Sequence, residues 1–124
     1  MTEPEGRIRV RSYEVSIWPD ELADDINADI WCLTVAYRGA GRWGVFRSSG
    51  NGGPCLGRDG TWAFGSPDEA DRAAWLANYR FTEQEALDLA RERAPGLRLN
   101  GYTAAEVLAE VLDNAATRHE GRRR

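Results

Sequence analysis

The sequence predicts an α+β fold, in which an antiparallel β-sheet of four to five strands, connected as a meander, packs against three C-terminal α-helices. Apolar and polar residues alternate through most of the first half, Gly-rich and Asp-Gly segments interrupt this alternation, and the second half contains three helix-start signals. A chain of 124 residues supports one hydrophobic core. We therefore expect a single domain over residues 1–116 and a frayed, Arg-rich tail over residues 117–124.

The first strand is predicted within residues 7–18, where the alternation changes phase. Apolar residues before Ser12 have even numbers, whereas those from Tyr13 to Ile17 have odd numbers. A change of parity moves side chains to the other face of a strand, so we expect a bulge or bend near Ser12. Pro19 ends the strand because it cannot donate a hydrogen bond to a neighbouring strand.

An acidic connection follows over residues 20–29, which contain five acids and no base. We expect either one helical turn or an acidic loop. The alternating oxygen-bearing residues from Asp25 onward have the spacing of a calcium-binding loop. However, Ile30 stands where that loop needs Gly, and Ala36 stands where it needs a bidentate Glu, so we reject a calcium site.

The most strongly patterned strand is predicted at residues 30–38. Both of its faces carry apolar residues, which is typical of an inner strand covered on both sides. One face should present Trp31, Leu33, Val35 and Tyr37. Asp59-Gly60 supplies the residue with positive φ that a tight hairpin needs. Further strands bounded by Gly-containing turns are predicted at residues 42–48, 55–57 and 61–64.

Each predicted helix begins with Ser or Thr followed three residues later by Glu. In this capping box the hydroxyl accepts from the third helical amide, and the Glu side chain accepts from the amide of the cap residue. The first helix should end near Tyr79 and the second before Pro95, and residues 97–99 should form a short strand before an Asn100-Gly101 turn. The three pairs are Ser66 with Glu69, Thr82 with Glu85, and Thr103 with Glu106.

The hydrophobic core is expected where the apolar faces of these elements meet. On strands these residues recur every second position, and on helices they recur at three- or four-residue spacing. The expected core residues are Val15, Ile17, Trp31, Leu33, Val35, Val45, Phe64, Trp75, Leu76, Leu87, Leu108, Val111 and Leu112.

Neither a catalytic site nor a metal site is predicted. The only histidine, His119, falls in the predicted tail, and Cys32 and Cys55 are far apart in the sequence. A structural zinc site needs about four Cys or His ligands, and a catalytic base must be held within hydrogen-bond reach of its partner. We expect no cofactor, reduced thiols and a soluble cytoplasmic protein, since the sequence has neither a membrane-spanning apolar run nor a signal peptide.

Charge is unevenly distributed along the chain. Residues 20–29 sum to −5 and residues 65–95 to −3, whereas residues 30–64 sum to +3, and all sixteen basic residues are Arg. The basic stretch alternates Arg with aromatic residues, and Arg, Trp and Tyr are the residues that most often anchor protein interfaces. The candidate partner-binding residues are Arg38, Arg42, Trp43, Arg47, Arg58 and Trp62.

Several segments resemble small proteins of actinobacteria and their phages. They lie within residues 41–108, a little over half of the chain, and include Arg42-Trp43-Gly44-Val45, the stretches 55–62 and 80–87, Ala94-Pro95-Gly96, and Asn100-Gly101-Tyr102-Thr103. The resemblance contains no catalytic motif and implies no particular activity, so no functional residue is transferred from it. It agrees with an Ala- and Arg-rich sequence that has no Lys.

The favoured hypothesis is a non-enzymatic accessory protein of a bacterium or its phage that binds a protein partner. Such a protein could inhibit a host or defence factor, or serve as an assembly component. The first alternative is nucleic-acid binding through the Arg and aromatic residues of segment 37–64, although a pI near 5.0 disfavours broad affinity for nucleic acid. A small enzyme of unknown chemistry is the second alternative. The oligomeric state stays open.

Overall fold

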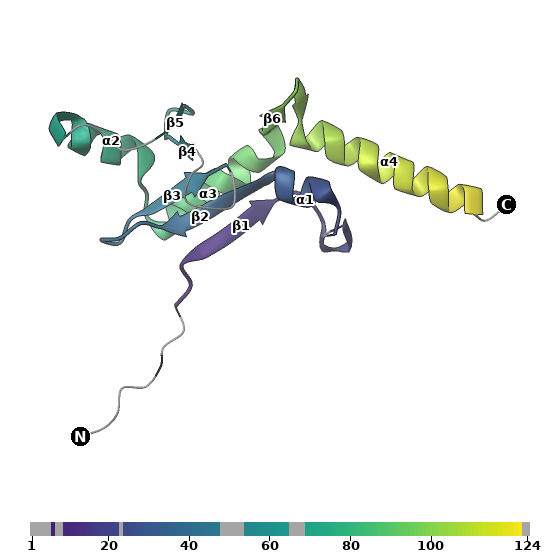
Figure 1. Cartoon of the computed structure of the whole chain (residues 1–124), viewed down its shortest axis with the longest axis horizontal. Helices are drawn as coiled ribbons and strands as arrows, with labels where there is room; N and C mark the ends of the chain where they lie inside the picture. Colours follow the sequence, from purple (N-terminus) through teal and green to yellow (C-terminus); the bar gives the residue numbers. More distant parts are fainter. Residues whose placement is uncertain (1–5, 7–8, 23, 48–53, 65–68, 123–124) are drawn as a thin grey trace.

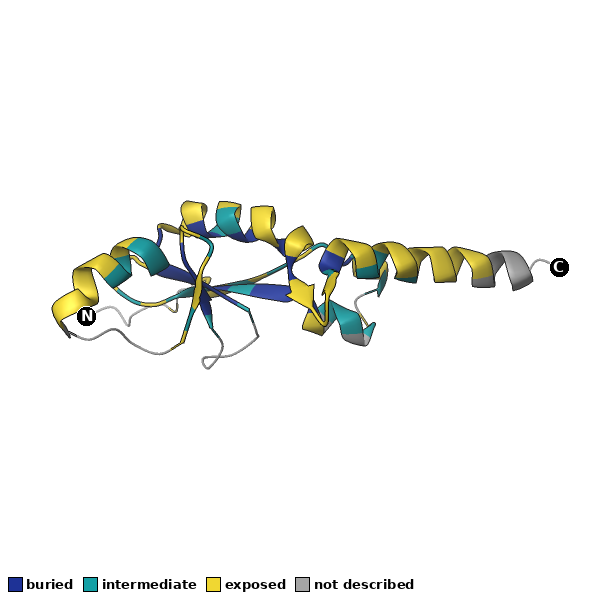
Figure 2. Cartoon of the chain, turned by 90° about the horizontal axis from the view of Figure 1, so that it is seen from above, coloured by how far each residue is buried: buried dark blue, intermediate teal, exposed yellow. Residues whose placement is uncertain are grey.

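The computed structural model describes residues 6, 9–22, 24–47, 54–64 and 69–122, and every structural statement below concerns these residues. Five antiparallel strands form one sheet, and α3 lies along one of its faces (Figure 1). Buried residues gather between α3 and the sheet (Figure 2). The predicted α+β class is therefore confirmed.

The strands and helices follow the predicted order, with additional short elements. The strands of the main sheet are β1 (Ser12–Ser16), β2 (Cys32–Tyr37), β3 (Trp43–Phe46), β4 (Cys55–Leu56) and β5 (Trp62–Ala63), and those of a small hairpin are β6 (Arg98–Leu99) and β7 (Tyr102–Thr103). The α-helices are α1 (Ile26–Ile30), α2 (Arg72–Tyr79), α3 (Glu83–Arg93) and α4 (Ala104–Arg122). The 3-10 turns are η1 (Asp20–Leu22), η2 (Glu69–Asp71) and η3 (Ala94–Gly96).

The sheet is a meander in the order β1-β2-β3-β4-β5. Tyr13 lies opposite Val35, which lies opposite Val45, so side chains of these three strands share one face. Leu33 and Val35 are completely buried on that face, as the alternation of residues 30–38 predicts. β1 begins at Ser12, where the sequence predicts a bulge or bend, and residues 7 and 8 lie outside the described part.

The acidic connection contains both a turn and a helix. η1 comes first, and Asp25 then caps α1 by accepting a 2.8 Å hydrogen bond from the Asn27 amide. An Asp at this position satisfies a helical amide that would otherwise have no partner. α1 ends at Ile30, so β2 begins two residues later than predicted.

Two of the three predicted capping boxes are present. The Glu85 amide donates to Thr82 Oγ1 at 3.2 Å, and the Thr82 amide donates to Glu85 Oε1 at 3.0 Å. Thr103 and Glu106 exchange the same two bonds at 3.2 and 3.3 Å. The third box begins at Ser66, which lies outside the described residues, and α2 begins after η2.

The core agrees with the predicted one only in part. Two predictions are wrong, because Phe64 is 77% exposed and Leu112 is 47% exposed. Phe64 follows a two-residue strand at the end of the sheet, and Leu112 belongs to α4, the helix that extends away from the sheet (Figure 1). Of the other predicted residues, Trp31, Leu33, Val35 and Val45 are buried, whereas Val15, Ile17, Trp75, Leu76, Leu87, Leu108 and Val111 are half-buried. Ala86 and Ala90 are buried, as the spacing of the predicted second helix indicates. Buried residues that were not predicted include Trp18, Trp43, Leu56, Phe81 and Leu97.

The C-terminal helix extends away from the sheet (Figures 1 and 2). Val107, Leu108 and Val111, in its first half, pack against the core, and the residues from Leu112 to Thr117 are exposed. The helix continues to Arg122, past residue 117 where the sequence predicts a frayed tail. In the part of the chain that the structure describes, no helix has the length and hydropathy to cross a membrane.

Candidate partner-binding site

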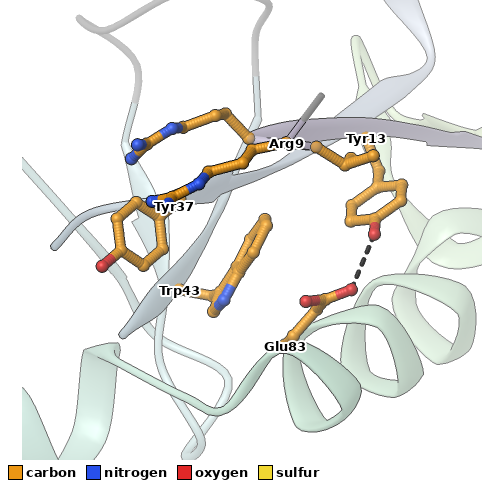
Figure 3. Close-up of a pocket in the computed structure, with 7 residues that line it drawn as sticks. Arg9, Tyr13, Tyr37, Trp43 and Glu83 are labelled. Atoms are coloured by element: carbon orange, nitrogen blue, oxygen red, sulfur yellow. Dashed lines mark hydrogen bonds between the residues drawn. The ribbon is translucent and has the colours of Figure 1, made fainter. Parts of the chain in front are cut away.

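A pocket of about 460 Å³ opens at one corner of the sheet. It lies between the segment that leads into β1, the end of the β2–β3 hairpin and the first turn of α3 (Figure 3). We call it the aromatic pocket, and its lining residues are Arg9, Val10, Arg11, Tyr13, Tyr37, Trp43 and Glu83.

The sheet register brings three aromatic rings together in this pocket. Tyr37 lies directly opposite Trp43, and their ring centroids are 5.5 Å apart in an edge-to-face arrangement. The Tyr13 ring lies 5.8 Å from Trp43 on its other side, so the indole sits between the two phenols (Figure 3). Offset and edge-to-face contacts are the favourable geometries for aromatic pairs. Trp43 is only 6% exposed and forms the floor of the pocket.

The main chain of Trp43 also fixes α3 beside the sheet. Its amide donates to the Phe81 carbonyl at 2.8 Å, and the Phe81 amide donates back to the Trp43 carbonyl at 2.9 Å. Glu83, the first residue of α3, is thereby held two residues from this bridge. The position of the acid in the pocket therefore depends on the sheet.

The carboxylate of Glu83 is engaged within the pocket. Tyr13 Oη donates to Glu83 Oε1 at 2.6 Å (Figure 3). This hydrogen bond is the main reason that the pKa of Tyr13 is raised above its usual value of 10.0, because the neutral phenol can donate to the carboxylate and the phenolate cannot. Tyr13 therefore acts as a hydrogen-bond donor at neutral pH.

Two arginines line the pocket opposite this carboxylate. Arg9 and Arg11 precede β1, and the Arg11 guanidinium lies 4.9 Å from the centre of the Tyr37 ring. Within the described residues neither arginine forms an ion pair. Two cations and one carboxylate give the pocket a net positive charge, so its guanidinium groups can receive an anionic partner.

The strand next to the pocket has an unpaired edge. The Tyr37 amide donates to the Arg11 carbonyl at 2.8 Å, so the main chains of Arg11, Tyr13 and Val15 point toward β2. The amides and carbonyls of the alternate residues Ser12, Glu14 and Ser16 point the other way. We call these groups the outer edge of β1. No strand in the described part of the chain pairs with them, because β1 is the first strand in the order of the sheet and its one neighbour is β2.

Three predicted site residues bind other parts of the protein. Arg58 donates to the carbonyls of Ala77 (2.9 Å) and Arg80 (3.3 Å) and to Glu85 (2.9 Å), and it lies over the Phe81 ring. Arg47 Nη2 donates to the Arg98 carbonyl at 2.6 Å. The Arg38 guanidinium lies 4.8 Å from the centre of the Phe46 ring. In these contacts the three guanidinium groups hold the fold together.

The other three predicted site residues have different positions. Arg42 is exposed and closes the β2–β3 turn, where the Arg38 amide donates to its carbonyl at 2.8 Å. Trp62 is exposed on β5, the strand at the opposite end of the sheet from β1. Trp43 lines the aromatic pocket but is buried there. The structure therefore places only this residue of the predicted set in the pocket.

Sequence reasoning missed most of the pocket. Arg9, Arg11 and Tyr13 have the same parity, which places them on one face of an extended segment. However, residues 9–13 lie outside the basic stretch 30–64, in which Arg and aromatic residues alternate. Glu83 carries no signal of its own, since it is one of several acids on a helix.

No family model, curated protein or solved structure matches the chain. The interpretation of the site therefore depends on its own geometry. Among the described residues, no three His, Cys, Asp or Glu side chains come together as a metal site requires.

Proposed function

We propose that this chain is a non-enzymatic binding protein that recognises a protein partner through the aromatic pocket and the outer edge of β1. The observation that carries the proposal is that Arg9 and Arg11, which form no ion pair with any described residue, line one pocket together with the rings of Tyr13, Tyr37 and Trp43. Arg, Tyr and Trp are the residues that dominate the energetics of protein interfaces. An unpaired strand edge beside them offers main-chain hydrogen bonds to the same partner.

A protein partner is favoured over nucleic acid by the positions of the arginines in segment 37–64. Arg47 and Arg58 donate to the protein itself, and Trp43 is buried, so these residues do not form one surface for phosphates and bases. The formal net charge of −4 also works against the non-specific phosphate attraction on which nucleic-acid affinity depends.

Two carboxylates outside the aromatic pocket, Asp59 and Glu85, lack the pKa shift of a general acid. Hydrogen bonds lower the pKa values of Asp59 and Glu85, so both stay ionised at neutral pH. A general acid needs the opposite shift, in which burial or a like charge raises the pKa of a carboxyl group. Location in the cytoplasm, an origin in an actinobacterium or its phage, and a role as inhibitor or assembly component belong to the same proposal.

The test is capture of a partner from an actinobacterial lysate by the tagged protein, with and without nuclease. The wild-type chain is compared with an Arg9→Ala/Arg11→Ala variant and with Arg91→Ala, which removes an exposed arginine on α3 that lies 4.0 Å from Asp88. We expect a protein that is retained by wild type and Arg91→Ala in both treatments, and lost from the double variant. Equal retention by the double variant, or loss of all material on nuclease treatment, would contradict the proposal.

A further inference from the structure

We infer that the partner supplies an extended, acidic peptide segment, which pairs with the outer edge of β1 as an added strand and places alternate carboxylates against Arg9 and Arg11. This inference rests on the proposed function and specifies the chemistry of the partner. It follows from three features of the corner where the aromatic pocket lies.

The first feature is the direction of the main-chain groups on β1. Ser12, Glu14 and Ser16 are exposed, and their amides and carbonyls point away from β2. Open strand edges pair readily with other strands, and folded proteins usually cover them. No strand in the described part of the chain pairs with this edge. An added strand would give these groups hydrogen-bond partners without breaking any bond between β1 and β2.

The second feature is the alternation of side chains. Residues on a strand point alternately to the two faces of the sheet, so every second residue of an added strand would lie on the face of the pocket. Directly opposite residues on paired strands have Cβ atoms about 4.5–5.5 Å apart, within reach of a guanidinium group. The residues on that face would therefore meet Arg9, Arg11 and Tyr13, the members of the pocket that come from this segment.

The third feature is the charge on the two faces. Glu83 accepts from Tyr13, and within the described part of the chain neither guanidinium group forms an ion pair, so two cations outweigh one carboxylate in the pocket. Glu14 points to the opposite face and would repel an acid placed there. The matching segment therefore carries acids at every second position and uncharged or basic residues between them.

A second copy of the chain is a poorer match for this edge. In an antiparallel pair centred on the middle of β1, Glu14 would lie opposite Glu14 of the other copy. Like charges directly opposite each other destabilise paired strands. We therefore do not expect edge-to-edge dimers, and the test includes a measurement that would detect them.

The test measures binding of fluorescein-labelled peptides of about eight residues, a common strand length. The probe alternates Glu with Thr. One control alternates Lys with Thr, and the other is the Glu–Thr peptide N-methylated on alternate amides, which cannot pair with a strand edge. On the protein, Glu14→Pro removes the outward amide and Glu14→Ala retains it, so the pair separates the main-chain bond from the side-chain charge.

We expect the Glu–Thr peptide to bind about tenfold more weakly to Glu14→Pro than to Glu14→Ala, the effect of one well-formed hydrogen bond. The wild-type protein should bind the N-methylated and the Lys–Thr peptides at least about tenfold more weakly than the probe. These two comparisons use only the wild-type chain and hold even if Glu14→Pro does not fold. Equal binding of the three peptides, or of the two folded Glu14 variants, would overturn the inference.

Retention of the captured partner by these variants shows whether only this inference fails or the proposed function fails as well. If Arg9→Ala/Arg11→Ala loses the partner and folded Glu14→Pro keeps it as well as Glu14→Ala does, strand pairing is wrong and the pocket still binds. If all three variants keep the partner, both proposals are wrong. A dimer of the free protein in sedimentation that Glu14→Pro abolishes would assign the edge to a second copy and overturn the inference.

Discussion

Arg58 joins the β4–β5 turn to two helices. Its guanidinium donates to the Ala77 carbonyl near the end of α2, to the Arg80 carbonyl that follows, and to Glu85 in the first turn of α3. A planar guanidinium can serve several acceptors at once, which an ammonium group on a flexible chain cannot do as well. Because its side chain is 46% exposed, water would replace part of these bonds if they were lost.

We predict that Arg58→Ala lowers the free energy of unfolding by about 1–2 kcal/mol, the range for loss of a few partly exposed hydrogen bonds to a charged group. Urea denaturation followed by tryptophan fluorescence measures the change. Arg91→Ala is the matched control, since Arg91 is 67% exposed and lies 4.0 Å from Asp88, and it should change stability by less than about 0.5 kcal/mol. An equal effect of the two variants would contradict the role given to Arg58.

Glu85 makes folding stability depend on pH in the acid range. Its hydrogen bond from Arg58 and its bond from the Thr82 amide lower its pKa from 4.5 to about 2. A carboxyl group whose pKa is lowered by folding stabilises the protein fully above its unfolded-state pKa. That contribution is lost as the pH falls, because the unfolded chain binds the proton first.

Accordingly, the free energy of unfolding should decrease as the pH falls from 4.5 toward about 2, and Glu85→Gln should weaken this dependence. Denaturation curves at a series of pH values measure it. Arg58→Ala should weaken the dependence in the same way, because the bond from Arg58 is the largest cause of the shift. If the free energy of unfolding of Glu85→Gln depends on pH as that of wild type does, Glu85 does not accept the bonds from Arg58 and the Thr82 amide.

Tyr13 reports on the geometry of the aromatic pocket. Its pKa is raised above 10.0 chiefly because its hydroxyl donates to Glu83. We predict that Glu83→Gln moves the Tyr13 pKa back toward 10.0, as followed by NMR titration of the tyrosine ring signals. Gln84→Ala, a change at the next position on α3, should leave the raised pKa of Tyr13 in place. An unshifted Tyr13 in the wild-type protein would mean that the pocket is not assembled as described.

At the scale of elements, Gly44 of β3 is packed tightly against the Phe46 ring and against Arg80, which follows α2. A Cβ atom there would lie 2.8 Å from two ring carbons of Phe46 and 3.1 Å from Arg80 Nη1. The Phe46 ring is buried and is covered by the guanidinium groups of Arg38 and Arg80, so it has little room to move. Only glycine lets these groups approach β3 so closely.

We predict that Gly44→Ala lowers the free energy of unfolding by about 1–3 kcal/mol, the usual effect of inserting a methyl group into a packed region. Gly96→Ala is the control, because no atom lies within 4 Å of the position its Cβ would take and its backbone is outside the left-handed region. Thermal or urea denaturation of both variants measures the change in the free energy of unfolding. Equal stability of Gly44→Ala and wild type would show that the Phe46 ring moves freely.

Elements whose signals are local could be predicted from the sequence. The Thr82 and Thr103 boxes each combine a hydroxyl and a carboxylate within four residues, and both helices begin where these boxes predict. The Asn100-Gly101 turn is equally local, and its two residues have the positive φ values that join β6 to β7. Local backbone chemistry therefore accounts for much of the agreement.

Features that depend on neighbours distant in sequence could not be predicted as well. Phe64 has strand-like alternation, but its exposure depends on the absence of a neighbour beyond β5 among the described strands. The aromatic pocket combines residues 9–13, 37–43 and 83, which only the sheet register and the Trp43–Phe81 bridge bring together. A single sequence contains no direct signal for such pairings.

At the scale of the whole molecule, the pocket and the outer edge of β1 occupy the same corner, while α4 extends away from the sheet (Figure 1). The other edge strand, β5, has only two residues, and three of the four predicted site arginines are used within the fold. A partner that contacts this corner could use main-chain bonds, guanidinium groups and aromatic rings together. Such a combination gives both affinity and selectivity to strand-addition interfaces.

Amide hydrogen exchange of β1, measured with and without the captured partner, tests this account most directly. We predict that the outward amides of Ser12, Glu14 and Ser16 become strongly protected on binding, whereas those of Tyr13 and Val15, already bonded to β2, change little. Unchanged exchange at all three outward amides, with protection appearing elsewhere on the molecule, would show that the partner binds another surface.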